Sequence, residues 1–238
     1  MLIQPSTSRP SFIRNSRVPL QIGQFESDNR MDEDLARIVL EGGGGGQKTE
    51  SYELAMYFMA RHTAIDCFDK RGRRGYLFLI GDELPYPKVS AAQVRDVIGD
   101  DLGEDISTET ILAELQRRYH VYYIIPAGSS YARDERILDH WRDLLGQNVI
   151  QLDDLEAVCE TIALTIGLEE GAIGLDEGLD HLLDVGSSAG TTVGRALATI
   201  GRAHGTVVRG PSLRSGSPGG SGASGGSGGS GDDGLIRL

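Results

Sequence analysis

The sequence predicts an α/β fold, a three-layer sandwich in which helices cover both faces of a mostly parallel central sheet. Three short runs, at residues 76–80, 121–125 and 149–152, are apolar almost throughout, as expected of strands buried on both faces. Around these runs, apolar residues recur every three or four positions, which is the spacing of one helix face. Strands that alternate with helices in this way indicate parallel βα units.

The chain begins with a segment that predicts no core. Residues 1–17 are rich in Ser, Pro and Arg, and we interpret them as an irregular leader. Residues 18–25 alternate apolar and polar side chains, which predicts a first strand. Acidic residues at 32–34 suit the first turn of a helix whose apolar positions run to Val39.

A polyglycine run at 42–46 separates this helix from the next one. The second helix is expected to start near Thr49 or Glu50 and to reach His62, with an apolar stripe that packs on the sheet. The strand at 76–80 follows, and we expect it to be central in the sheet.

The rest of the domain repeats the alternation of helix and strand. Helices are predicted around 111–115, 137–145 and 155–166, the last of them closing a domain of residues 18–168. Residues 169–209 predict a short helical extension. Residues 210–238 form a Gly/Ser-rich tail with an apolar tip at 235–238, and such a composition does not order itself.

The charge and the cysteine content exclude several classes of protein. The formal net charge is −12, from 35 acidic and 23 basic side chains, which argues against nucleic-acid binding. Cys67 and Cys159 are too few for a disulfide framework or a zinc knuckle. We find neither a signal peptide nor an apolar run long enough to cross a bilayer, so a cytoplasmic protein is expected.

Two oxygen-bearing side chains are the candidate metal ligands. Thr49 follows the glycine run at a predicted helix start, and Asp82 follows the strand at 76–80. Ligands of parallel sheets gather at the carboxyl ends of strands, and Mg²⁺ prefers such hard oxygen ligands. Mn²⁺ is the other candidate. Each residue also has a structural interpretation, Thr49 as a helix N-cap and Asp82 as a turn aspartate.

These features together resemble a von Willebrand factor A-like (VWA) domain of the bacterial, intracellular type. The resemblance covers residues 18–168 and rests on the run 42–49 with its helix, on the strand at 76–80 with its Gly-Asp-Glu, and on the terminal strand-helix alternation. It implies a Rossmann-like sheet with a metal-ion-dependent adhesion site (MIDAS).

Only part of the metal-site motif of that family is matched here. Thr49 matches the threonine of a later loop and Asp82 matches the aspartate after a central strand. The first motif, Asp-x-Ser-x-Ser, has no counterpart, and its first strand is missing. Residues 105–109 come closest but predict a helix cap.

The resemblance implies a non-catalytic protein-interaction module, assisted by Mg²⁺. Intracellular VWA proteins often act as adaptors beside AAA+ ATPases, so an AAA+ ATPase is the expected class of partner. Glu83, Tyr86 and Lys88 flank the Asp82 loop and are the candidate partner contacts. Two alternatives stay open, namely an α/β hydrolase or nucleotide-dependent enzyme with its site at the strand carboxyl ends, and a truncated remnant.

Overall fold

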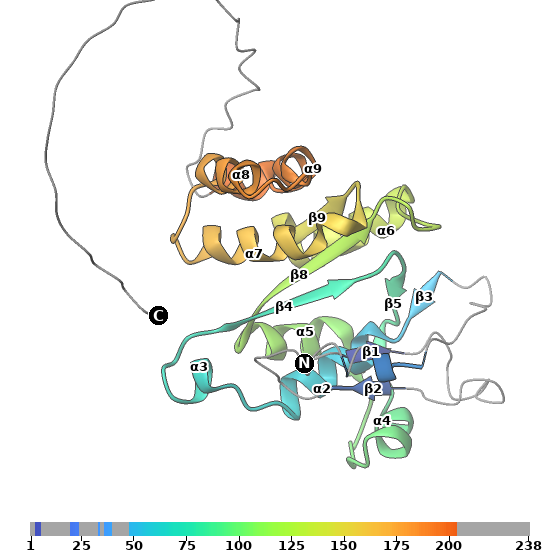
Figure 1. Cartoon of the computed structure of the whole chain (residues 1–238). Helices are drawn as coiled ribbons and strands as arrows, with labels where there is room; N and C mark the ends of the chain where they lie inside the picture. Colours follow the sequence, from blue (N-terminus) through green and yellow to red (C-terminus); the bar gives the residue numbers. More distant parts are fainter. Residues whose placement is uncertain (1–2, 6–19, 24–32, 34–35, 40–47, 204–238) are drawn as a thin grey trace, which may run out of the picture. The chain divides into compact units, whose positions relative to one another are not determined.

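A computed structural model describes residues 3–5, 20–23, 33, 36–39 and 48–203 (Figure 1). The polyglycine run at 42–46 and the predicted tail at 210–238 lie outside the described residues.

The main sheet has three parallel strands in the order β4-β8-β9. These strands are β4 (Gly75–Ile80), β8 (Tyr119–Pro126) and β9 (Val149–Leu152). All three predicted apolar runs are therefore strands, and the predicted α/β fold is confirmed. The expectation that 76–80 is the central strand is wrong, because β8 pairs on both sides whereas β4 pairs only with β8 in the described part of the chain.

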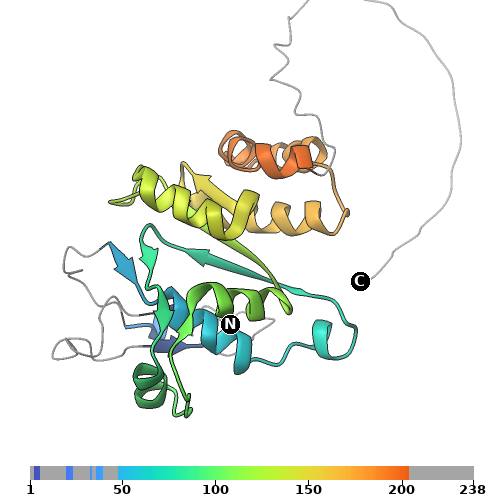
Figure 2. The same ribbon diagram turned by 180° about the vertical axis from the view of Figure 1, so that it is seen from behind.

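One face of the sheet is covered by α2, α5 and α6. Alternate side chains of β8, including Val121, Tyr123 and Ile125, are buried against these helices. The bounds are α2 (Tyr52–Arg61), α5 (Thr108–Gln116) and α6 (Glu135–Leu145). Figures 1 and 2 both show α2 beside α5 on this face.

The other face is covered by the last four helices. Tyr122 and Ile124 of β8 pack there with buried Leu175, Val193 and Leu197. The bounds are α7 (Val158–Glu169), α8 (Leu175–Asp184), α9 (Gly190–Ala196) and α10 (Ala198–Ala203). The described helices of the predicted extension, at residues 175–203, are thus part of the same sandwich, since they share one buried core with this face of the sheet.

The N-terminal strands form a separate antiparallel pair. β2 (Leu20–Ile22) lies within the predicted strand at 18–25 and pairs with β1 (Ile3–Pro5). β1 falls in the leader predicted to be irregular, and that expectation is wrong for these three residues because their backbone joins the ladder with β2.

The segment around Thr49 also differs from the prediction. Thr49–Glu50 is a short strand, β3, which pairs in parallel with β5 (Leu84–Pro85). Helix α2 begins at Tyr52, with Ser51 at its N-cap and no side-chain capping hydrogen bond. Thr49 is therefore not a helix N-cap, because its backbone is used in pairing with the segment that follows Asp82.

Smaller elements connect β4 to α5. Ser107 accepts a hydrogen bond from the Thr110 amide at 3.2 Å, which confirms the helix-cap interpretation of residues 105–109. The connecting elements are α3 (Asp66–Asp69), β6 (Lys88–Val89), α4 (Ala91–Val97) and β7 (Ile106–Ser107). Strand β6 pairs with β7 in the antiparallel sense. Two 3₁₀ turns, η2 (Gly146–Asn148) and η3 (Leu155–Ala157), lie later in the chain. Among the described residues, no helix combines the length and apolarity that a membrane span requires.

Candidate functional site

The loops after β4 and β8 meet at the carboxyl end of the sheet. The Asp82 carboxylate, two residues past the end of β4, accepts a hydrogen bond from the backbone amide of Tyr131 at 2.7 Å. Tyr131 lies in the loop between β8 and α6. Asp82 therefore fixes one loop against the other, in addition to any role in binding.

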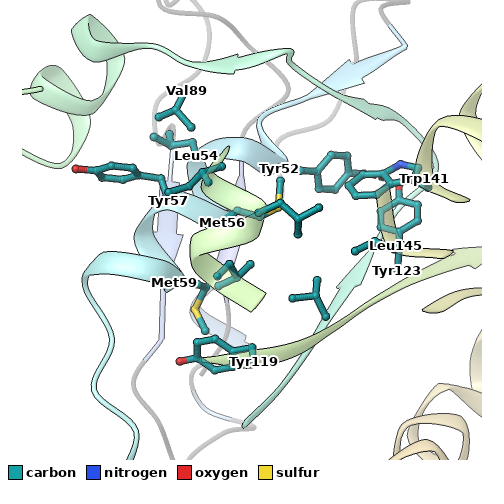
Figure 3. Packing of buried hydrophobic residues seen from close by; sticks show 14 of the residues in the cluster. Tyr52, Leu54, Met56, Tyr57, Met59, Val89, Tyr119, Tyr123, Trp141 and Leu145 are labelled. Carbon is teal, nitrogen blue, oxygen red and sulfur yellow. Dashed lines mark hydrogen bonds between the residues drawn. The ribbon is translucent and has the colours of Figure 1, made fainter. Parts of the chain in front are cut away.

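A cluster of buried aromatic rings holds the next residue, Glu83, in place. The carbonyl oxygen of Glu83 accepts hydrogen bonds from Tyr123 Oη at 3.1 Å and from Trp141 Nε1 at 2.9 Å. Tyr123 stacks on Trp141 with ring centroids 3.8 Å apart, and Tyr52 contacts both rings edge-on (Figure 3). Because these rings belong to three different elements, they position the loop rigidly.

The loop approaches this cluster closely at Gly81. A Cβ atom at position 81 would lie 1.9 Å from Tyr52 Oη, far inside contact distance. Glycine is thus required for the chain to leave β4 along this path.

Three carboxyl groups, of Glu50, Asp82 and Glu83, lie close enough to influence one another's ionisation. Burial raises the pKa of Glu83 to about 7, and the negative charges of Glu50 and Asp82 add to that rise. Burial also raises the pKa of Glu50, against a hydrogen bond from Tyr52 and with a contribution from Asp82. We call these three residues the acidic cluster.

One oxygen of the acidic cluster has no hydrogen-bond partner among the residues that the structure describes. Glu83 Oε2 is buried and makes no hydrogen bond with the described part of the chain. Lys48, which precedes Thr49 in the chain, is engaged by Asp134 at 2.6 Å and lies over the Tyr131 ring. A buried carboxylate oxygen without a donor is unfavourable, so a cation or donor from outside would stabilise it.

The predicted metal ligands are only partly brought together. Thr49 pairs with Leu84, two residues beyond Asp82, so the two candidates lie on adjoining segments. Within the described ranges, no three His, Cys, Asp or Glu side chains are arranged to hold a metal ion. These residues therefore do not make a closed Mg²⁺ cage, and any Mg²⁺ would have to keep several water ligands.

The three predicted partner contacts lie in different surroundings. Glu83 belongs to the acidic cluster, as described above. Tyr86 was expected in an exposed loop, but only 6% of it is exposed, and its carbonyl accepts a hydrogen bond from Thr108 Oγ1 at 2.6 Å. Lys88 is exposed and forms an ion pair with Asp105 at 2.6 Å.

Sequence reasoning missed Glu50 and the aromatic residues of this site. Glu50 was expected in the first turn of a helix, whereas it ends a strand that faces the Asp82 loop. Tyr52, Tyr123 and Trp141 lie on α2, β8 and α6, and only the packing of these three elements brings their rings together. The doubled tyrosine at 122–123 within an apolar strand was the one available signal.

Comparisons of this chain with models of protein families, with curated proteins and with solved structures find no match.

Proposed function

We infer that the chain is a non-catalytic protein-interaction module that receives a positively charged group of its partner at the acidic cluster. The observation that carries this proposal is the buried Glu83 Oε2, which makes no hydrogen bond in the described part of the chain and lies near two further carboxyl groups. A lysine, an arginine or a divalent cation would supply the missing charge.

The VWA-like interpretation adds further parts to the proposal. In that interpretation Mg²⁺ or Mn²⁺ joins Asp82 to a carboxylate of the partner, the partner is an AAA+ ATPase, and both act in the cytoplasm. The position of Asp82 past the end of a parallel strand supports this interpretation, while the open ligand set predicts weak binding of metal alone.

Thermal unfolding with added cations tests the proposal. Millimolar Mg²⁺, millimolar Mn²⁺ and an oligolysine peptide are added separately to the wild type and to Asp82→Asn and Glu83→Gln variants. Asp82→Asn keeps an oxygen acceptor for the Tyr131 amide while it removes the charge. We expect at least one of these cations to raise the Tm of the wild type by ligand linkage, and to raise the Tm of both variants less.

The control is Glu104→Gln, which changes an exposed carboxyl outside the acidic cluster and should respond as the wild type does. A rise with Mg²⁺ or Mn²⁺ supports the metal-assisted form, and a rise with oligolysine alone supports direct contact with a basic partner. A wild-type Tm that none of the three additions moves overturns the proposal.

A second candidate function is favoured by the Glu83 pKa of about 7, because a carboxyl that titrates near neutral pH suits general acid-base catalysis. In that case the chain is an α/β enzyme with Glu83 as the proton-transferring group. Turnover of ester, phosphate or nucleotide substrates by the wild type and by Glu104→Gln, but not by Glu83→Gln, would establish the enzyme and displace the interaction module.

A further inference from the structure

The last strand of the sheet, β9, has an open edge. Leu152 accepts a hydrogen bond from the Ala127 amide at 2.8 Å, and the parallel register pairs Ile150 with Ile124. In a parallel ladder, alternate residues of a strand bond to the same neighbour. The backbone groups of Ile150 and Leu152 therefore point to β8, while those of Val149, Gln151 and Asp153 point away from it. Among the described residues no further strand pairs there.

A groove of about 560 Å³ lies along this edge. It is lined by residues of α6 and η2, by residues of α9 and α10, and by the three residues whose backbone points outward. Figure 1 shows α6 and α9 near β9. The volume falls within the range of about 300–1,000 Å³ that is usual for ligand sites.

Two arginines and one aspartate line the groove, so its lining has a formal charge of +1 in a chain whose net charge is −12. Arg142 lies 3.5 Å from Asp139 and donates to Gln151 Oε1 at 3.3 Å. Arg195 pairs with Asp153. The two arginine side chains remain 46% and 69% exposed, so each has donors left for another acceptor.

We propose that the β9 edge binds an extended acidic peptide, which adds to the sheet as a fourth strand. The peptide backbone pairs with the outward N–H and C=O groups of Val149 and Gln151, as in β-strand addition. Its carboxylate side chains pair with the exposed donors of Arg142 and Arg195. This site is separate from the acidic cluster and does not depend on the function proposed there.

The charge of the groove favours such a peptide over a second copy of the chain. Pairing of β9 with β9 would bring two chains of net charge −12 into contact, and like charges that meet at an interface oppose association. The repulsion between an acidic peptide and the whole chain is screened beyond about 8 Å at physiological ionic strength. The two arginines act at shorter range, because both line the groove that the bound strand would occupy.

Fluorescence anisotropy of labelled peptides tests the proposal. The probe is an extended peptide with two adjacent glutamates between valines, because neighbouring side chains of a strand point to opposite faces and can thus reach both Arg142 and Arg195. The comparison peptides replace glutamate by lysine or carry N-methyl groups on alternate residues. We expect the acidic peptide to bind, and both comparison peptides to bind at least about tenfold more weakly, since each loses either the charge pairs or the strand hydrogen bonds.

Variants of the chain test the strand hydrogen bonds and the charge pairs separately. Gln151→Pro removes an outward N–H without removing a bond to β8, and proline is tolerated at such edge positions. Gln151→Ala is its matched control, because it removes the side chain and keeps the N–H. We expect binding to fall about threefold to tenfold in Gln151→Pro relative to Gln151→Ala. Arg195→Glu should weaken binding further, whereas Arg95→Glu, on α4, should not.

Hydrogen exchange keeps the test decisive if a variant fails to fold. In the wild type, saturating acidic peptide should slow exchange of the amides of Val149, Gln151 and Asp153. The proposal is overturned if the acidic peptide does not bind at millimolar concentration, if it binds without slowing these amides, or if the lysine peptide binds equally well. Protection of the same amides by dimerisation without peptide, seen in sedimentation, overturns it in favour of a second copy.

Discussion

At the scale of single residues, the Glu83 carboxyl makes stability depend on pH. Its pKa rises from 4.5 to about 7 on folding, so between these values the folded protein holds a proton that the unfolded chain has released. Stability is therefore lost as pH rises through this window, and the loss is complete above about pH 7.

Glu83→Gln removes this dependence. The variant should match the wild type near pH 4.5 and become more stable than it by about 1–2 kcal/mol near pH 8, an estimate lowered for the partial exposure of the group. Urea unfolding at several values of pH measures the difference, with Glu104→Gln as control. A difference between wild type and Glu83→Gln that does not change with pH would contradict the assignment.

Gly81 gives a second prediction at this scale. Gly81→Ala places a Cβ against Tyr52 Oη and should destabilise the fold by about 1–3 kcal/mol. Gly103→Ala, where a Cβ meets nothing within 4 Å, should change stability by less than about 0.5 kcal/mol. In a double-mutant cycle, Tyr52→Phe should recover part of the cost of Gly81→Ala because it removes the clashing hydroxyl. Purely additive effects would show that the clash is absent.

At the scale of elements, a substitution at Thr49 tests whether this residue belongs to a strand or caps a helix. In β3 the Thr49 backbone pairs with Leu84, and no side-chain capping bond opens α2. Thr49→Val should therefore change stability by less than about 0.5 kcal/mol, because valine suits a strand. Loss of an N-cap would instead cost about 1 kcal/mol. Urea unfolding distinguishes the two values, with Ser107→Val, which removes a true cap of α5, as the positive control.

The junction of α9 and α10 yields a second prediction for elements. Leu197 is fully buried in the core under the sheet, whereas 66% of Leu183 on α8 is exposed. Leu197→Ala should cost about 2–5 kcal/mol, and Leu183→Ala close to nothing. Chemical unfolding of the two variants checks this contrast, and equal costs would mean that α9 and α10 do not pack on the sheet.

At the scale of the whole molecule, local patterns predicted the sheet but not the surroundings of the site. The runs at 76–80, 121–125 and 149–152 are strands because continuous apolar segments of that length can only be buried between two layers. The order of the strands and the pairing of Thr49 with Leu84 depend on contacts between distant segments, which no local pattern encodes.

The candidate site was likewise predictable only where a local sequence pattern marks its residues. Asp82 and Glu83 were found because a polar loop follows a buried strand, and they do lie at the carboxyl end of the sheet. The exposure of Tyr86 was misjudged, since turn chemistry around it says nothing of the Thr108 hydroxyl that approaches its carbonyl. Whether Thr49 and Asp82 bind Mg²⁺ stays a prediction.

The buried cores on the two faces of the sheet indicate which residues unfold together as one cooperative unit. Tyr122 and Ile124 of the central strand are fully buried by helices that include α8, α9 and α10. A chain of residues 1–168, which ends where the predicted domain of residues 18–168 ends, would leave much of this face to water, and a sheet covered on one face only invites association. A chain of residues 1–208 keeps all the described helices.

We expect residues 1–208 to unfold in urea with the same midpoint as the full chain. We expect residues 1–168 to unfold without a cooperative transition and to bind a hydrophobic dye. A cooperative transition of residues 1–168 at the midpoint of the full chain would instead mean that the last three helices add no stability to the sheet.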